Sequence, residues 1–387
     1  MVRAAAIDAA LRRATDTGEI AGVVAMATTA SDLVYQGCFG VADLGTGRRL
    51  AANDIFRIAS MTKAITSVAA MQLVEQGRLS LDGPIAAELP HLAAPMVLDG
   101  FNGPMPILRP AAGPITLRQL LTHTAGFGYD AWNTDLTRAT TALGLPGRPT
   151  TIDELARFPL LFDPGTRWNY SIATDIVGHA IAAASGMPID DYLATHITIP
   201  LGMADTGFTL SDAQRPRLVA VHQRQADGNL GAGDRPAGNG PAFLAGGGGL
   251  CSTAGDYTRF LRMLLRGGTL DGARILSAAT VTEMGRNHIG ALDVLPMRSA
   301  MPASSYDCEL FPGMVKKWGL GFLINTEAGP DGRSANSMAW AGLVNTYFWL
   351  DPTAGVAGVL LTQSMPFADP KALDLLGAFE RGVYGQA

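Results

Sequence analysis

The chain is poor in lysine and cysteine, and it lacks both basic clusters and long apolar runs. Its 387 residues hold four lysines and three cysteines, and the net charge is −5. Without a run of basic residues, the chain has little electrostatic attraction to nucleic acids or anionic lipids. Hydrophobic residues make up 48% and charged residues 16%, as in a well-packed globular protein. We therefore expect a small-molecule substrate, no nucleic-acid partner and no membrane partner; oligomeric state leaves no signal in the sequence.

The cysteines and histidines show no spacing typical of a disulfide framework or a metal site. Cys38, Cys251 and Cys308 are odd in number and far apart, and none belongs to a Cys-x-x-Cys pair. The six histidines form no His-Glu-x-x-His motif and no other paired metal spacing. We therefore predict neither a metal nor an organic cofactor.

The first 22 residues predict an amphipathic helix, not a signal peptide. Asp8, Arg12 and Arg13 interrupt every apolar stretch in this segment. Elsewhere no run of 18 or more apolar residues is present, so no membrane-spanning helix is expected. With few cysteines as well, a cytoplasmic location is the default expectation.

Strand-like segments lie near both ends of the chain, and helical segments lie between them. The expected strands are residues 22–29, 33–40, 319–325, 346–351 and 355–362. If the two groups hydrogen-bond, they form one antiparallel sheet with a helical region inserted in the chain between them.

This pattern predicts two parts. Residues 1–84 and 245–387 would form an α/β subdomain from both chain ends, and residues 85–244 a mostly helical, loop-rich inserted subdomain. The active site is expected in the cleft between them. Glycine and proline are densest in residues 95–114 and 225–241, which we expect to be loops.

One lysine stands in an unusual setting, in the segment FRIASMTKAITSVAAM (residues 56–71). This segment predicts a core helix that ends before Gly77. Ser60 and Lys63 are three residues apart and share a helix face. Ser60 also lies near the helix start, where free N–H groups favour an oxyanion. A buried lysine with a lowered pKa could take the serine proton, so we predict a neutral Lys63 that activates Ser60.

By itself, the Ser-x-x-Lys pattern is weak. A core helix with a structural lysine satisfies it equally well, because short motifs recur by chance. In favour of catalysis, this is the only such motif in the chain, and apolar residues surround it.

Several segments resemble the serine β-lactamases and penicillin-binding proteins, and most closely the family VIII carboxylesterases on the class C β-lactamase fold. The nucleophile region, IASMTK at residues 58–63 with LSLD at 79–82, carries the first likeness. Further matches follow in the family's order: LLTHTAG (120–126), FDPGTRWNYS (162–171), GGGLCST (247–253) and WGLGF (318–322). The resemblance implies an α/β fold of the α+β type, with an antiparallel sheet flanked by helices and an inserted, mostly helical subdomain.

The resemblance also implies roles for particular residues. Tyr170 falls where these enzymes place a catalytic tyrosine that works with the lysine, here Lys63. The segment Trp340-Ala341-Gly342-Leu343 matches their Trp-Gly-Gly strand. On that match, the backbone N–H groups of Ser60 and Leu343 would form the oxyanion hole, and Gly342 would let the substrate approach the strand.

Two departures from the β-lactamase pattern bear on the substrate. Ile172 replaces a common asparagine, and Trp340 stands where a Lys-Thr-Gly strand would carry its lysine. Without that lysine, no cation is supplied there for a substrate carboxylate. Both residues instead offer apolar surface, which favours neutral, short acyl esters.

Other residues have weaker claims to the site. Tyr129 and Phe127 follow the LLTHTAG segment and either line the substrate pocket or pack in the core. His123 suggests a Ser-His-Asp triad, but no Gly-x-Ser-x-Gly motif is present, so we interpret it as a structural histidine bonded to backbone. The glycine run at residues 246–249 is interpreted as a turn or a close packing contact.

The sequence therefore predicts a serine carboxylesterase that forms an acyl-enzyme on Ser60, with Lys63 and Tyr170 as base. Cleavage of β-lactams or amides, or transfer of the acyl group to an alcohol, is the alternative for the same residues. A second alternative is a homologue that binds ligands without turnover. Residual β-lactam hydrolysis is compatible with the first interpretation.

Overall fold

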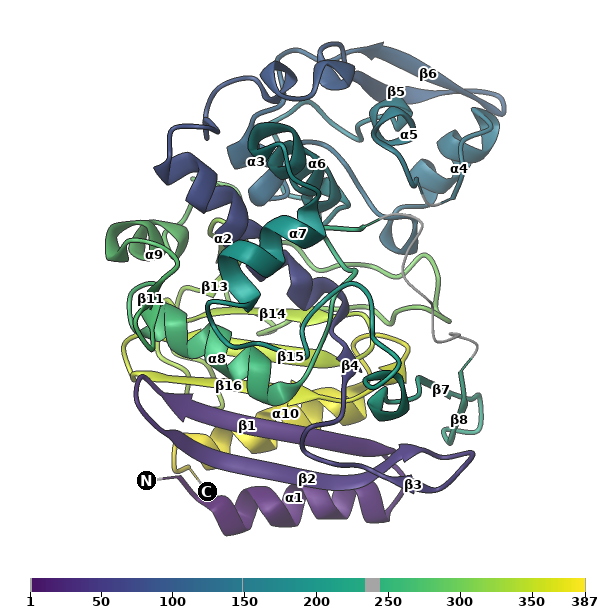
Figure 1. Ribbon diagram of the computed structural model, residues 1–387. Helices are drawn as coiled ribbons and strands as arrows, with labels where there is room; N and C mark the ends of the chain where they lie inside the picture. Colours follow the sequence, from purple (N-terminus) through teal and green to yellow (C-terminus); the bar gives the residue numbers. More distant parts are fainter. Residues whose placement is uncertain (1, 148, 234–243, 387) are drawn as a thin grey trace.

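The computed structural model describes residues 2–147, 149–233 and 244–386. At its centre is an eight-stranded sheet in which every neighbouring pair is antiparallel. In spatial order the strands are β12 (Lys316–Trp318), β13 (Leu323–Asn325), β14 (Met338–Gly342), β15 (Thr346–Asp351), β16 (Val356–Leu361), β1 (Gly22–Thr29), β2 (Leu33–Asp43) and β3 (Arg48–Arg49). Because β1 pairs with β16, the two ends of the chain share one sheet, as expected (Figure 1).

Helices cover both faces of this sheet, which explains why its central strands are buried along their whole length. Helix α8 (Ala254–Leu265) packs against β1, β15 and β16 and lies in front of the sheet in Figure 1. Helix α10 (Pro370–Val383) lies behind the sheet and packs against α1 (Ala4–Asp16). Every residue of β14, β15 and β16 is buried. The predicted antiparallel sheet flanked by helices is confirmed.

The middle of the chain supplies most of the remaining helices. They are α2 (Thr62–Glu75), α3 (Leu117–Leu121), α4 (Thr134–Ala142), α5 (Ile152–Arg157), α6 (Ala173–Ser185) and α7 (Ile189–Leu193), followed later by α9 (Ala278–Met284). Helix α2 packs against α6 and α7, and twelve of its residues are buried. It connects the region of the sheet with the upper, helical region in Figure 1. The subdomain boundaries given above stay a prediction.

Smaller pairs of strands complete the fold. They are β4 (Phe56–Arg57) with β9 (Cys251–Ser252), β10 (Thr269–Leu270) with β11 (Ala273–Arg274), and β7 (His222–Arg224) between β8 (Leu230–Ala232) and β17 (Ser364–Met365). The expected loop at 95–114 is wrong, because β5 (Met96–Asn102) and β6 (Met105–Pro110) pair there as a hairpin. Gly103, with a φ of 58°, allows the tight turn between them. In the second expected loop, residues 234–241 lie outside the described residues.

The end of helix α2 agrees with the sequence prediction, whereas a glycine shortens one expected strand. Helix α2 ends just before Gly77, whose φ is 68°. The side chain of Thr253 caps α8 by accepting a hydrogen bond from the N–H of Asp256 at 3.1 Å. The strand expected from residue 319 begins only at Leu323, because Gly321 takes a φ of 99° that breaks the extended chain. Among the described helices, none has the length and apolar character needed to span a bilayer.

Candidate active site

Ser60 lies in a short 3-10 helix, Ala59–Met61, that runs directly into α2. The preceding Ala59 has a φ of 44°, a left-handed conformation that costs a non-glycine residue roughly 1–3 kcal/mol. Strand β14 packs closely against this segment. A Cβ added to Gly342 would lie 2.4 Å from the carbonyl oxygen of Ile58, so only glycine allows this approach. The strained entry and the packed strand together hold Ser60 at the start of the helix.

The Lys63 ammonium contacts Ser60 as the helix spacing predicts. Its Nζ donates to the Oγ of Ser60 at 3.2 Å, to the hydroxyl of Tyr129 at 3.1 Å and to the carbonyl oxygen of Gly247 at 2.7 Å. The side chain is 1% exposed. All three protons of an ammonium group therefore have acceptors in a site with almost no access to water.

The surroundings of Lys63 favour its charged form. Burial acts to lower the pKa of Lys63, but the oxygens of Tyr129, Tyr170 and Asp175 outweigh burial and raise it above its ordinary value. The prediction of a neutral lysine in a dry pocket is therefore wrong. Burial was expected from the sequence, whereas the ring of acceptors around the amine was not. The ammonium form of Lys63 is therefore the favoured one.

Tyr170 lies beside this ammonium and contacts Trp340 of β14. Its hydroxyl oxygen accepts a hydrogen bond from the indole Nε1 of Trp340 at 3.1 Å, and Lys63 Nζ is 4.9 Å from the centroid of its ring. The centroid of the Trp340 ring lies 4.8 Å from that of Tyr170. Two residues chosen from separate motifs are thus brought into direct contact, and both are buried.

Tyr129 has a larger part in the site than the sequence indicated. Besides its bond to Lys63, its ring centroid is 5.4 Å from that of Tyr170. Burial raises the pKa of Tyr129, and the nearby Lys63 only partly opposes this, so its hydroxyl is protonated at neutral pH. The sequence analysis considered Tyr129 only as a residue that lines the substrate pocket or packs in the core.

Asp175 and Gly247 are site residues that the sequence analysis missed. Asp175, in the first turn of α6, accepts a hydrogen bond from the N–H of Gly247 at 2.7 Å. A Cβ on Gly247 would lie 2.9 Å from Asp175 Oδ1 and 3.2 Å from Lys63 Nζ, so only glycine fits between them. This confirms that the glycine run makes a close packing contact. The sequence offered one signal for Asp175, namely a carboxylate five residues after Tyr170.

His123 is structural, with a different partner from the one expected. Its Nδ1 lies 3.1 Å from the hydroxyl of Ser171, and its ring packs edge-on against Tyr170 and Trp318. Burial holds the pKa of His123 well below its ordinary value, so the ring is neutral. The sequence analysis expected the ring to bond to backbone, whereas its hydrogen bond is to the side chain of Ser171.

A cavity of about 350 Å³ opens beside Ser60. Most residues predicted for the site line it: Ser60, Tyr129, Tyr170, Ile172, Trp340 and Leu343. Phe127 is not among the lining residues; it is buried, and its carbonyl oxygen accepts a bond from Asn169 at 2.9 Å. Gly342 is also absent from the lining, and a Cβ at this position would meet the carbonyl oxygen of Ile58; its predicted contact with substrate stays a prediction.

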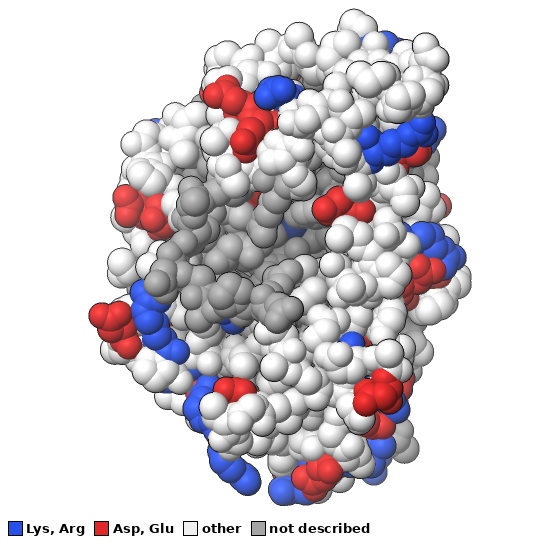
Figure 2. Space-filling view, turned by 90° about the vertical axis from the view of Figure 1, so that its right-hand side faces the viewer, with Lys and Arg blue, Asp and Glu red and all other residues white. Residues whose placement is uncertain are grey.

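The rest of the cavity is mostly apolar and extends toward α4. Its far end is formed by Leu136, Thr140, Leu145 and Phe158. Asp130 and Asp175 are the charged residues among the described lining, which includes no arginine or lysine. On the molecular face shown in Figure 2, most Lys, Arg, Asp and Glu side chains lie toward the margins.

Within the described ranges, no three His, Cys, Asp or Glu side chains come together as ligands for a metal ion. The reactive groups of the cavity are instead a hydroxyl, an ammonium and two phenols. These are the components of nucleophilic catalysis through a covalent intermediate.

A family model described as Beta-lactamase matches residues 7–381. The chain belongs to the beta-lactamase family. It is 31% identical to a lovastatin esterase from Penicillium rubens over 98% of both chains. It is 33% identical to a monacolin J acid methylbutanoyltransferase from Aspergillus terreus, covering 98% of this chain and 95% of the relative.

The fold agrees with the same family. A solved structure of a simvastatin synthase mutant from Aspergillus terreus superposes with a TM-score of 0.84 at 30% identity, covering 98% of this chain and 96% of the other. This beta-lactamase-family protein therefore stands among esterases and acyltransferases, and its similarity to them supports assignment as a hydrolase of this fold.

Proposed function

We propose that the protein is a serine carboxylesterase that cleaves short, uncharged esters through an acyl-enzyme on Ser60. The observation that carries this proposal is the contact between Lys63 Nζ and Ser60 Oγ at 3.2 Å at the wall of an apolar cavity. A structural lysine would need acceptors, but it would need neither a serine hydroxyl in a substrate-sized cavity nor two phenols beside it.

In the first step the Oγ of Ser60 attacks the ester carbonyl carbon. An ammonium at Lys63 cannot accept the proton of Ser60, so the proposed base is the oxygen of Tyr170, which must first release its own proton to solvent and act as a phenolate. The Lys63 charge and the Trp340 N–H, which donates to the Tyr170 oxygen at 3.1 Å, both stabilise that phenolate.

The tetrahedral intermediate carries a negative charge on the former carbonyl oxygen. We assign the backbone N–H groups of Ser60 and Leu343, which both line the cavity, as its hydrogen-bond donors. As the intermediate collapses, Tyr170 returns the proton to the leaving alkoxide and the alcohol departs. Water then repeats the sequence: Tyr170 takes its proton, hydroxide attacks the acyl carbon, and Ser60 Oγ leaves with the proton.

The charges of the cavity select against anionic substrates. Asp130 and Asp175 are the charged groups of its described lining, and no arginine or lysine there could pair with a carboxylate. Ile172 and Trp340 add apolar surface close to Ser60. Neutral esters with small acyl groups therefore fit the cavity better than substrates bearing a carboxylate beside the scissile bond.

The direct test combines turnover with labelling. Purified protein is incubated with a short-chain p-nitrophenyl ester and, separately, with a serine-reactive phosphonate whose adduct is mapped by mass spectrometry. We expect ester turnover, loss of turnover after labelling, and a single adduct on Ser60. Turnover with the adduct on another residue contradicts the assignment of the nucleophile. The absence of both turnover and adduct contradicts the proposed function and favours a binding homologue.

Acyl transfer to an alcohol is the second candidate. It is favoured by the similarity to a methylbutanoyltransferase and by a cavity that continues past Ser60 to α4, leaving room for an acceptor. β-Lactam cleavage has less support, because Trp340 and Ile172 replace the strand lysine and the asparagine of the β-lactamase pattern.

Partitioning of the acyl-enzyme distinguishes these activities. We expect that adding a small neutral alcohol to the ester reaction yields some transfer product while hydrolysis continues, since both acceptors attack the same intermediate. Rates on the ester, on a cephalosporin and on a small cyclic amide should fall in that order. Product analysis by chromatography measures each fraction. A cephalosporin hydrolysed faster than the ester contradicts this order.

A further inference from the structure

The proposed oxyanion donor lies in a tight turn between two buried strands. β14 ends at Gly342 and β15 begins at Thr346, and these two residues pair directly. The turn between them, residues 343–345, is called the Leu343 turn below. Asn345 closes it with a φ of 56°, a left-handed conformation that asparagine adopts more readily than most residues. A three-residue turn ending in this conformation is a common hairpin connection.

The side chain of Asn345 uses its full hydrogen-bonding capacity. Its Nδ2 donates to the carbonyl oxygens of Ser364 at 2.8 Å and Pro366 at 2.7 Å. Its Oδ1 accepts from the hydroxyl of Tyr347 at 2.7 Å and from the N–H of Asp369 at 3.2 Å. Asn345 has no exposed surface. Four bonds on a buried amide fix its orientation, because breaking any of them leaves a buried polar group unpaired.

The backbone of the Leu343 turn is held separately by the segment that follows β16. The hydroxyl of Thr362 donates to the carbonyl oxygen of Asn345 at 2.8 Å and lies 3.3 Å from that of Val344. The N–H of Ser364 donates to the Val344 carbonyl oxygen at 3.1 Å. Once these carbonyl groups are fixed, the peptide planes of the turn have little freedom to rotate.

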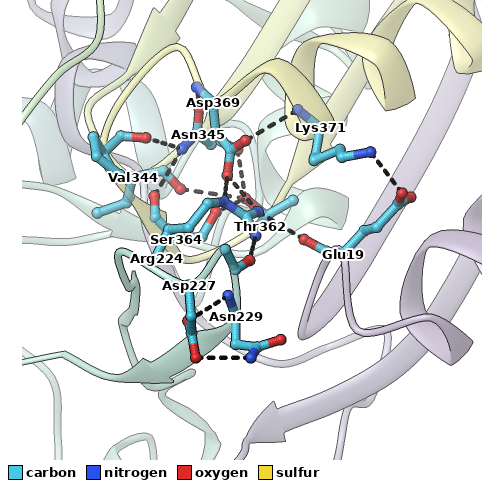
Figure 3. A network of polar contacts seen from close by, with 12 residues as sticks. Glu19, Arg224, Asp227, Asn229, Val344, Asn345, Thr362, Ser364, Asp369 and Lys371 are labelled. Carbon is cyan, nitrogen blue, oxygen red and sulfur yellow. Dashed lines mark hydrogen bonds and ion pairs between the residues drawn. The ribbon is translucent and has the colours of Figure 1, made fainter.

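The network continues from the turn to the edge of the molecule, as Figure 3 shows. Asp369 accepts a hydrogen bond from Arg224 Nε at 2.7 Å, and both side chains are largely buried. Arg224 also donates to the Glu19 carbonyl oxygen at 2.8 Å, and Lys371 Nζ bonds the Glu19 carboxylate at 2.7 Å. The Leu343 turn is thereby tied to β7, to the start of α10 and to the chain preceding β1.

None of these residues lines the cavity, yet the bonds from Thr362, Ser364, Pro366, Tyr347 and Asp369 all reach the two residues directly after Leu343. A hairpin turn needs no such number of buried bonds to close. Oxyanion stabilisation, in contrast, depends on a donor that is already oriented before charge develops. A displacement of about 1 Å at such a donor costs on the order of 10²-fold in rate.

We propose that Asn345 and Thr362 are positioning residues that orient the Leu343 N–H for the oxyanion. This inference rests on the proposed function. It assigns a role to buried polar residues that touch no substrate, and it predicts that their loss acts on the transition state more than on substrate binding.

Thr362→Val is the principal test, because valine keeps the shape of threonine and removes the hydroxyl. We expect kcat for the short-chain ester to fall about 10-fold while KM changes less than about 2-fold. A boronic acid that forms a tetrahedral anionic adduct on Ser60 should lose affinity by a factor similar to the fall in kcat. Asn345→Gly, which retains the left-handed backbone and removes all four side-chain bonds, should give a larger fall where it folds.

Tyr384→Phe is the matched control. The Tyr384 hydroxyl bonds Asp351 at 2.9 Å and accepts from Trp349 at 3.1 Å, at the opposite end of β15 from the Leu343 turn. It should lower the melting temperature to a similar extent as Thr362→Val, while leaving kcat and the boronic acid affinity unchanged.

The outcomes separate this inference from the proposed function. If the wild-type protein turns over ester but Thr362→Val matches it in kcat and boronic acid affinity, the positioning role is wrong and the esterase assignment stands. A fall in kcat equal to that of Tyr384→Phe also overturns it, because both would then report stability alone. If the wild-type protein neither turns over ester nor binds the boronic acid, the proposed function itself fails.

Discussion

Ser60→Ala is expected to reduce ester turnover by about 10³-fold or more and to leave the fold intact. The substitution removes the oxygen assigned as the nucleophile. The other lining groups that accept a hydrogen bond from Lys63 are the phenol of Tyr129 and the backbone carbonyl of Gly247. The fold should survive because Lys63 keeps its bonds to Tyr129 and Gly247. One lost hydrogen bond costs about 1 kcal/mol of stability.

The measurement is kcat/KM on a p-nitrophenyl ester together with thermal unfolding of the same preparations. Arg286→Ala is a suitable control, because it breaks an exposed ion pair with Glu283, neither residue lines the cavity, and turnover should be unchanged. Retained activity in pure Ser60→Ala protein rules out Ser60 as the nucleophile. A large fall in melting temperature would instead indicate that the lost activity reflects unfolding.

Tyr170→Phe should have the second largest effect, a fall in kcat of about 10²- to 10⁴-fold, the usual contribution of a positioned general base. Phenylalanine keeps the ring packed against Trp340, Tyr129 and His123. It removes the oxygen that takes the proton of Ser60. It also leaves the indole N–H of Trp340 without its partner, which costs about 1–3 kcal/mol of stability.

Tyr129→Phe provides the comparison within the same site. Its hydroxyl bonds Lys63 at 3.1 Å, but burial keeps that phenol protonated, so it supports the ammonium and takes no proton from Ser60. We expect a fall of at most about 10-fold. Steady-state kinetics on both variants decides between the two tyrosines: a larger loss in Tyr129→Phe than in Tyr170→Phe would reverse their roles.

The charge of Lys63 changes how the site is understood. A neutral lysine would itself be the base for Ser60, whereas an ammonium acts by stabilising negative charge on a neighbouring oxygen. Asp175 in α6 contributes to this charge state, although the sequence analysis did not assign it to the site. The proposed general base therefore moves from the Lys63 and Tyr170 pair to the oxygen of Tyr170.

Gly342 illustrates a different limit of motif-based reasoning. The sequence analysis interpreted this glycine as a place where the substrate approaches the strand. In the structure, the carbonyl oxygen of Ile58 also lies close to it, because β14 packs against the segment that precedes Ser60. A glycine in a sequence shows that a side chain is absent, but only the packed structure identifies the atoms that lie where the side chain would be.

By itself, the sequence determined the features that depend on local periodicity and on ordered motifs. The spacing of Ser60 and Lys63 brings them to one helix face whatever the rest of the chain does, and their contact follows. The five segments in family order likewise sufficed for the fold class, and the strand-like segments near both chain ends predicted most strands of the sheet.

Only the tertiary structure decided the electrostatics of the site and the support behind it. The acceptors of Lys63 in Tyr129 and Gly247 lie 66 and 184 residues away along the chain. The bonds that hold Asn345 likewise connect the Leu343 turn to Ser364 and Asp369. Such contacts join irregular segments with no common period, so no local pattern records them. They exist because packing brings these segments together, and the pKa of a buried group depends on that arrangement.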